Sequence, residues 1–454
     1  MRSYRFHERD CAARQYGLFR PDREANKGFA FGARRFGALS TSANAQSDNA
    51  NDYDLTAALD PASGALSVTG TIDIVADKRT EEIEMLINGQ LRIERISFSR
   101  EAEMQTENGI TFGTYPLPHT QRMRIALAQP MEPGDHLQIA LAYSGNLTTE
   151  SFEMGRGIVS PLWTELSADA LWYPVWYDEP DIRYTLSLDL PPQFDVVGPG
   201  TYDLVGDGKW RLSSPDIVNT RITFAASDSW TIAEREIGDG LTGAVYTARR
   251  TAKTDSILAG LEQVFEAYRG FLGAPSLSTG AIKIIYPGPE IEPTYPQQAY
   301  VAGNDFIVLD ESDLQVQLDT LNHEVAHLWW SRGAPGTPDE FLSESIAEYL
   351  AKRHGGDFWG AEWLERQRDR MRARSEKIDT SLLEIDGFTS DRQALLYNRG
   401  PTMLFALQDR VGREAIDALL HEVHSRQADT LDDFFGILSA RHGDAMVDWA
   451  KEHL

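Results

Sequence analysis

The chain has 454 residues, 42% hydrophobic and 25% charged, which is typical of a globular protein and is enough for two or three domains. The formal net charge of -26 argues against nucleic acid or an anionic membrane surface as a partner. Cys11 is the only cysteine, so internal disulfides and cysteine-rich metal sites are excluded. No apolar run is long enough for a membrane span.

Residues 1–48 are basic in a chain that is otherwise acidic: nine Lys and Arg stand against four Asp and Glu between Met1 and Ser40. Small residues at the end of this segment resemble a cleavage site. A signal peptide needs a continuous apolar stretch, however, and Arg34 and Arg35 interrupt this one. We interpret the segment as a disordered or targeting tail. We expect the protein to be cytoplasmic, with a periplasmic or secreted location as the alternative.

Residues 49–238 alternate apolar and polar side chains in short runs such as "ALSVTGTIDIVA", "HLQIALAYSG" and "YTLSLDLP". The runs end at Gly, Pro or Asp. This period of two predicts antiparallel strands with one buried face. We therefore expect an N-terminal antiparallel β-sandwich or saddle-like domain.

Residues 239–454 change to a mixed α/β pattern that becomes mainly helical. The segment "TDSILAGLEQVFEAYRGFLG" has helical spacing and a closing glycine, while "AIKIIYPG" and "DFIVLDE" read as short strands. Further helices are expected at 314–331, 340–354, 357–375, 391–411, 413–424 and 429–453. The sequence thus predicts a multidomain α and β protein with a boundary near 235–245.

The segment "LNHEVAHLWW" at 321–330 carries the chemistry. His323 and His327 lie four positions apart, so on a helix both imidazoles can reach one ion. Glu324 is turned by about 100° around the helix, which suits a general base rather than a ligand. Zinc would lower the pKa of a water molecule whose proton this carboxylate accepts. The alternative is an ordinary helix with solvated or hydrogen-bonded histidines.

A third ligand is expected from the next helix, "EFLSESIAEYLAKR" at 340–353. Glu344 is the natural candidate. Glu348 lies one turn further on the same face and could orient a ligand histidine, although a solvated glutamate is the alternative. Glu340 is a rival ligand, but an acid at a helix start is also favoured by the helix dipole.

These residues resemble the gluzincin aminopeptidase family, typified by membrane alanyl aminopeptidase and leukotriene A hydrolase. The family motif is HExxH followed, after 18 residues, by a glutamate within "L-N-E-G". Here 16 residues (328–343) separate His327 from Glu344. The resemblance implies a thermolysin-like catalytic domain and extends over most of 50–454, without the large C-terminal helical domain of many members.

The family also has a tyrosine in a "Y-x-K-G" segment, which is similar to "YNRG" at 397–400. By this resemblance Tyr397 would donate a hydrogen bond to the oxyanion of the tetrahedral intermediate. Arg399 replaces the family's lysine. It could bind a substrate carboxylate or serve a structural salt bridge.

One departure from the family concerns the strand that carries "G-A/G-M-E-N", whose glutamate binds the substrate's α-amine. Here the segment reads "QQAYVAGN" and has no acid. A buried amine without a counter-charge is costly. By resemblance the substrate-binding edge comprises Tyr300, Val301 and Ala302. The acids that could replace the missing one are Glu165, our first choice, Glu290 and Glu292; the alternative for each is a solvated loop carboxylate.

The sequence predicts a zinc metallopeptidase with one Zn²⁺ per chain and a peptide as substrate. An aminopeptidase acting on short peptides is the first reading. The alternatives are an endopeptidase or a hydrolase of N-blocked peptides, and a non-catalytic binding module with the same fold. The side-chain preference and the oligomeric state stay open.

Overall fold

The computed structural model describes residues 50–153, 157–176, 182–214, 221–238, 240–275, 277, 279–288, 291 and 299–454. The tail expected at 1–48 lies outside the described residues. So do Glu290 and Glu292, two of the acids considered for amine binding.

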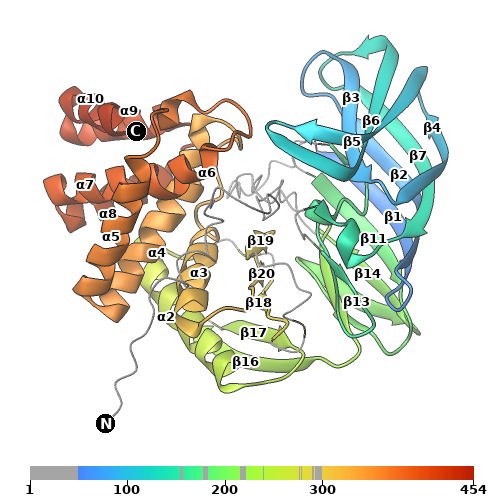
Figure 1. The fold of residues 1–454 in the computed structure, drawn as a ribbon, viewed down its shortest axis with the longest axis horizontal. Coiled ribbons are helices and arrows are strands. Elements are labelled where there is room, and N and C mark those ends of the chain that lie inside the picture. The colour runs from blue at the N-terminus through green and yellow to red at the C-terminus, as the bar shows by residue number, and fades with distance from the viewer. Residues whose placement is uncertain are drawn as a thin grey trace.

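A seven-stranded sheet forms the outer wall of the β region (Figure 1). In strand β1 (Asn51–Asp60) the side chains of Tyr53, Leu55 and Ala57 are buried and alternate with exposed ones, as the period of two predicts. The strands β1 and β11 pair in parallel, and the other neighbours pair antiparallel. In spatial order the strands are β13 (Thr201–Gly206), β14 (Lys209–Ser213), β11 (Ile182–Asp189), β1 (Asn51–Asp60), β2 (Ala65–Val75), β7 (His136–Asn146) and β4 (Leu91–Phe98).

Two four-stranded sheets complete the β region. The first contributes to the same apolar core as the seven-stranded sheet, which makes the two a sandwich. In order its strands are β10 (Val175–Trp176), β3 (Thr80–Asn88), β6 (Tyr115–Met131) and β5 (Ala102–Phe112). The second consists of β12 (Asp195–Val197), β15 (Phe224–Ser227), β9 (Thr164–Leu166) and β8 (Ile158–Val159). Short 3₁₀ turns occur at Thr149–Ser151 and Ala168–Ala170.

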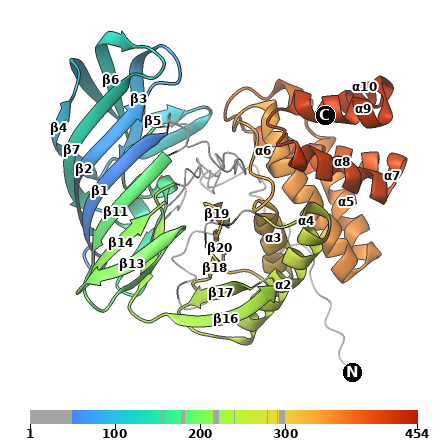
Figure 2. The same cartoon turned by 180° about the vertical axis from the view of Figure 1, so that it is seen from behind.

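A five-stranded mixed sheet lies between the β region and the helices (Figures 1 and 2). Helix α2 (Ala252–Leu272) packs on it and ends at Gly273, whose φ of 84° stops the helix. Strand β16 pairs with β17 in this sheet, so it belongs with the strands after residue 240, although its sequence pattern continues that of the β region. The strands in order are β16 (Thr231–Gly238), β17 (Leu241–Thr247), β18 (Ala281–Ile285), β20 (Phe306–Val308) and β19 (Tyr300–Ala302).

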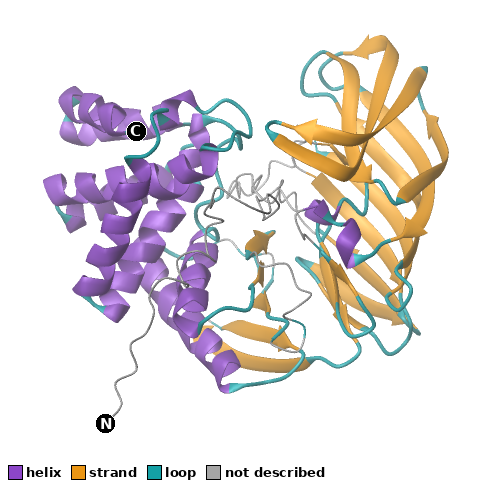
Figure 3. Ribbon diagram, in the orientation of Figure 1, coloured by secondary structure: helices purple, strands orange, loops and turns teal. Residues whose placement is uncertain are grey.

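The C-terminal part is helical (Figure 3). The segment expected to be one helix at 429–453 is two helices, because Gly443 has a φ of 82° and interrupts it. The helices are α3 (Leu314–Ala326), α4 (Glu344–Trp359), α5 (Ala361–Ser375), α6 (Arg392–Ala394), α7 (Gly400–Val411), α8 (Arg413–Ser425), α9 (Leu431–His442) and α10 (Asp444–His453). A π-helical turn spans Leu395–Arg399, and 3₁₀ turns span Pro338–Leu342 and Leu382–Glu384.

The two sides of the molecule meet in two places. At the base, a third apolar cluster joins Trp163 and Ala225 of the β region to Tyr300 and Phe306 of the five-stranded sheet. At the opposite end, the β5–β6 turn reaches the loop before α6 (Figure 1), where the rings of Phe112 and Phe388 lie 5.0 Å apart. The two sides are therefore joined by side-chain contacts at both places.

The expected fold class is confirmed: an N-terminal β region with several sheets precedes a mixed and then mainly helical region. Among the described residues, we find no helix with the length and apolar character that crossing a membrane requires.

Candidate metal centre and active site

Helix α3 presents His323 and His327 on one face, and each ring is held at its Nδ1 atom. His323 Nδ1 lies 3.0 Å from Glu348 Oε2, and His327 Nδ1 lies 2.8 Å from the carbonyl oxygen of Trp330. A carboxylate and a carbonyl only accept hydrogen bonds, so both rings carry their proton on Nδ1. In the neutral form of each ring this leaves Nε2 with the lone pair that a metal ion needs.

The end of α3 makes the second of these contacts possible. The helix was expected to run to 331, but it ends at Ala326 and a turn follows. Within a continuing helix the Trp330 carbonyl would point along the axis toward a later N–H. After the turn it faces back to His327 instead.

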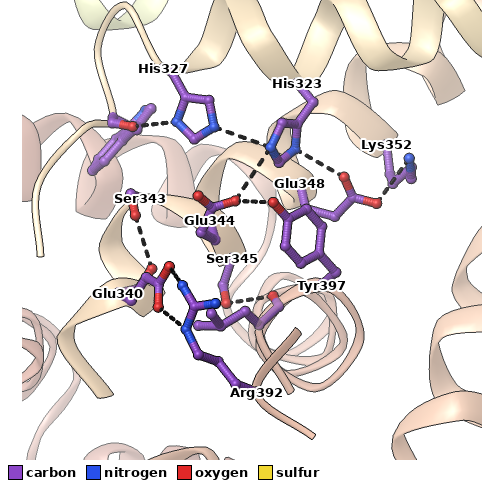
Figure 4. A network of polar contacts seen from close by, with 12 residues as sticks. His323, His327, Glu340, Ser343, Glu344, Ser345, Glu348, Lys352, Arg392 and Tyr397 are labelled. Atoms are coloured by element: carbon purple, nitrogen blue, oxygen red, sulfur yellow. Dashed lines mark hydrogen bonds and ion pairs between the residues drawn. The ribbon is translucent and has the colours of Figure 1, made fainter. Parts of the chain in front are cut away.

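Three donor atoms converge at this place (Figure 4). The Nε2 atoms of the two histidines lie 3.1 Å apart, and Glu344 Oε2 lies 3.6 Å from that of His323. All three ligand atoms lie within 4.8 Å of one another, and all three side chains are buried. Two ligands at ~2.0–2.1 Å from a tetrahedral zinc ion are themselves roughly 3.3–3.4 Å apart. The donor set and its spacing therefore suit zinc.

The electrostatic surroundings favour a positive charge at this point. Burial by itself lowers the pKa of His323, but hydrogen bonds to Glu344 and Glu348 and the charge of Glu324 raise it overall to about 10. Burial by itself raises the pKa of Glu348, but the charge of Lys352 and the hydrogen bond from His323 lower it overall. Glu348 is thus held as a carboxylate.

Glu324 follows His323 directly in α3 and is itself buried. Its carboxylate is close enough to His323 to raise the pKa of the imidazole. This proximity agrees with the spacing argument, which puts a carboxylate beside the ligand face without making it part of it.

Tyr397 comes from the π-helical turn that precedes α7. Its ring stacks on the imidazole of His323, with centroids 5.4 Å apart and an interplanar angle of 20°, and its hydroxyl donates to Glu344 Oε2 (Figure 4). Turns of π-helix occur often at functional sites because they shift one side chain relative to its neighbours. The turn brings this hydroxyl to Glu344, one of the three candidate ligands.

Gly400 sets how closely α7 approaches α4. A Cβ atom at this position would lie 2.1 Å from Ser345 Oγ, inside any normal contact. Ser345 in turn donates a 2.7 Å hydrogen bond to the Leu396 carbonyl, in the turn that carries Tyr397. Gly400, which matches the glycine of the family motif, therefore allows α7 to pack closely against α4.

Glu340, the rival ligand, is engaged away from the three donor atoms. Its carboxylate is paired with the Arg392 guanidinium, whose Nε lies 2.6 Å from Oε2, and it also accepts a hydrogen bond from the N–H of Gly336. Within the described residues, the group with metal-binding geometry contains Glu344 and not Glu340. A second carboxylate with its own buried counter-charge is already neutralised, which explains why it stays apart.

Arg399 contacts main-chain oxygens rather than a carboxylate. Its guanidinium donates to the carbonyls of Ser375, Ile378 and Thr380 and, at 3.2 Å, to Ser375 Oγ. These contacts close the loop after α5. They favour a structural role for Arg399 over the binding of a substrate carboxylate.

The expected substrate-binding edge is β19. Tyr300 donates a hydrogen bond to Glu165 of β9, and both side chains are buried. Val301 packs into the core shared with α2 and α3, and Ala302 into the cluster at the base. The structure thus brings Glu165 and Tyr300 together.

Sequence reasoning missed Lys352 and Asp319. They extend the polar contacts of Glu348 away from His323, with Lys352 Nζ 2.9 Å from Glu348 Oε1 and 2.7 Å from Asp319 Oδ2. The signal that could have found them is their spacing, since each lies four positions from a residue already singled out on the same helix.

Comparisons with known proteins agree in fold. No family model matches the chain, and no curated protein matches it. Among solved structures, an M1 zinc metallopeptidase from Deinococcus radiodurans is similar at 14% identity, with a TM-score of 0.62 over 89% of this chain and 93% of that one. A mutant of the same protein bound to a Tyr-Ser-Ala substrate gives 15% identity and a TM-score of 0.59, with 89% and 93% covered.

Native yeast LTA4 hydrolase is similar as well, at 16% identity and a TM-score of 0.63 over 90% of this chain and 69% of that one. At such identities a likeness establishes the fold and no more. The chain has the fold of M1 zinc metallopeptidases.

Proposed function

We propose that this protein is a zinc-dependent peptidase of the gluzincin type, with one Zn²⁺ held by His323, His327 and Glu344. The observation that carries the proposal is the convergence of two imidazole Nε2 atoms 3.1 Å apart with a buried carboxylate oxygen. Facing lone pairs in a buried place are unfavourable unless a cation or a proton lies between them. The similarity in fold to zinc metallopeptidases supports the same assignment.

Zinc, when bound, would polarise the scissile carbonyl and make water a stronger acid. Glu324 would accept a proton from the attacking water and deliver it to the leaving amine as the C–N bond breaks. The hydroxyl of Tyr397 would donate to the oxyanion that forms on the former carbonyl oxygen. Glu348 would keep the His323 ring in the orientation and tautomer that a ligand needs.

Release of N-terminal residues from short peptides is the first candidate for the reaction. It rests on the resemblance of "HEVAHLWW", Glu344 and "YNRG" to aminopeptidase motifs. The tripeptide-bound structure of the Deinococcus protein is in keeping with a short peptide as substrate.

Cleavage without recognition of a free amine is the second candidate. Its support is the strand β19, which has no acidic residue, together with the Tyr300 hydroxyl that already donates to Glu165. A carboxylate that accepts from a tyrosine has less capacity left for an ammonium group. An endopeptidase or a hydrolase of N-blocked peptides would not need that capacity.

Metal analysis tests the proposal. Protein purified without chelator should contain about one zinc ion per chain, and a peptide library read by mass spectrometry should be cut only when zinc is present. Protein that binds zinc but cuts no peptide would indicate the non-catalytic module. Protein that binds no zinc at all would refute the metal site.

The two candidate reactions separate by substrate. Free aminoacyl amides should be cleaved, and N-acetylated peptides should not, if the enzyme is an aminopeptidase. In that case Glu165→Gln should raise KM for the free-amine substrates. The control is Glu150→Gln, at an exposed position in the 3₁₀ turn Thr149–Ser151. Cleavage of blocked peptides alone would overturn the aminopeptidase reading.

A further inference from the structure

Two helices face each other with polar residues at four-residue spacing. On α3 these are Asp319 and His323, and on α4 they are Glu344, Glu348 and Lys352. Residues four apart lie on one helix face, so each helix presents a single polar row. The two rows run antiparallel, since Asp319 meets Lys352 while His323 meets Glu344 and Glu348.

The contacts form an unbroken chain from Asp319 to His323. Asp319 Oδ2 lies 2.7 Å from Lys352 Nζ, which lies 2.9 Å from Glu348 Oε1, and Glu348 Oε2 lies 3.0 Å from His323 Nδ1 (Figure 4 shows the last two). We call these four residues the α3–α4 polar network. Each of them is at most 6% exposed.

Burying an ammonium group and carboxylates in this way is expensive for stability alone. Replacing a buried ion pair by apolar side chains of similar volume is often neutral or even stabilising. A buried lysine on α4 therefore calls for a reason beyond helix packing. The geometry offers such a reason. Lys352 contacts one carboxylate oxygen of Glu348, and the other oxygen of Glu348 contacts His323.

A carboxylate held at only one oxygen can rotate about its last side-chain bond. Glu348 is held at both, by Lys352 on one side and by the His323 ring on the other. Its plane is thereby fixed, and with it the direction in which His323 presents Nε2. Contacts of this kind behind a metal ligand usually change metal affinity when they are removed.

We propose that Lys352, held in place by Asp319, is a positioning residue that orients the metal ligand His323 through Glu348. The inference rests on the proposed zinc site and extends it by two residues, one on each helix. The contacts from Asp319 to Lys352, from Lys352 to Glu348 and from Glu348 to His323 form one path, so we expect the effect on metal binding to pass through Glu348.

The chain offers a matched control for the loss of a buried lysine. Lys283 is also 2% exposed and is paired with Asp305 at 3.0 Å, but it lies on β18 and donates to the carbonyls of Gly198 and Gly200. Lys352→Met and Lys283→Met remove the same group from equally buried ion pairs. Both should lower the melting temperature of the metal-free protein.

The deciding measurement is the zinc dissociation constant, obtained by competition with a chromophoric chelator. Lys352→Met should raise it about 10- to 100-fold, and Lys283→Met should leave it unchanged. Asp319→Asn should raise it by a smaller factor. The double variant Asp319→Asn/Lys352→Met should match Lys352→Met alone, because both residues act along one path. The absorption bands of Co²⁺ bound in place of zinc should shift in the same variants.

A zinc dissociation constant for Lys352→Met within twofold of the unaltered protein would overturn the inference. If Lys352→Met does not fold, Asp319→Asn decides, and an unchanged dissociation constant and Co²⁺ spectrum in that variant would overturn it equally. The proposed function fails separately, when the unaltered protein itself binds no zinc.

Discussion

The Nε2 atoms of His323 and His327 face each other at 3.1 Å, and neither ring is free to turn because its Nδ1 atom is held from behind. One ring is held by a carboxylate and the other by a main-chain carbonyl. The two side chains are thus already ordered for the proposed zinc ion, so less of its binding free energy would be spent on side-chain entropy.

Tyr397→Phe should reduce kcat about 10²–10³-fold, the usual effect of losing one oxyanion donor. KM should hardly change, because phenylalanine keeps the stacking on His323. Assays at saturating zinc keep the lost hydrogen bond to Glu344 from lowering the metal content. Steady-state kinetics on a peptide substrate, with zinc measured on the same sample, checks this. Tyr349→Phe is the control, since that hydroxyl lies on α4 and donates at 2.6 Å to Gln408 of α7. Equal activity in both variants would contradict the role given to Tyr397.

Gly400→Ala should destabilise the protein by about 1–3 kcal/mol, as overpacking does, because the new methyl group would collide with Ser345. Gly436→Ala is the matched control. It adds the same methyl group within helix α9, where nothing lies within 4 Å, and should be neutral or stabilising. Urea unfolding of both variants gives the comparison. A Gly400→Ala variant as stable as Gly436→Ala would mean that α7 does not approach α4 this closely.

The contact of Phe112 with Phe388 should couple the two sides of the molecule. A double-mutant cycle of Phe112→Ala and Phe388→Ala should give a coupling free energy of about 0.5–1.5 kcal/mol in unfolding, as aromatic pairs do. The same cycle with Phe358→Ala, at an exposed ring on α4, should be additive. Additivity in both cycles would show that the β5–β6 turn does not engage this loop in solution.

Asp310 should make stability depend on pH. Burial raises its pKa to about 6, assisted by the charge of Glu311, while its own backbone N–H and Lys253 act in the lowering direction. A carboxyl group whose folded pKa lies above its unfolded pKa holds its proton longer in the folded state. The stability it contributes is therefore present below the unfolded pKa of 3.8 and is lost as the pH rises to about 6.

The variant Asp310→Asn removes this titration. The free energy of unfolding of Asp310→Asn, relative to the unaltered protein, should increase by on the order of 2–3 kcal/mol between pH 3.5 and pH 7. Asp207→Asn, at an exposed turn, is the control for removing a charge. Urea unfolding at several pH values checks the sign. A relative stability that falls with rising pH would contradict the burial of an ionisable Asp310.

The spacing of residues within one helix predicted which side chains lie close together in the candidate site. His323 and His327 on α3, and Glu344 and Glu348 on α4, face one place as the four-residue period predicts. The alternation of apolar side chains likewise predicted the β-rich first half. Both rules are local, so a single sequence is enough to apply them.

Contacts between distant segments could not be predicted in this way. Glu340 has the sequence features of a ligand, and only the fold brings Arg392 to it from 52 positions away. Arg399 matches the basic position of the family's "Y-x-K-G" segment, but its partners are main-chain carbonyls. A pattern of side chains cannot predict such partners. The sequence pattern of strand β16 is the same as that of the strands before it. Only the fold shows that it pairs with β17 in the five-stranded sheet.

The measurement that tests the central claim most directly is turnover and zinc content of Glu324→Gln, determined on one sample. Glutamine preserves the shape of the side chain but cannot accept the proton of water. The account predicts a kcat lower by about 10²–10⁴-fold, as for loss of a general base, with one zinc ion per chain retained. Full activity in this variant, or loss of its zinc, would contradict the assignment of Glu324 and of the site built around it.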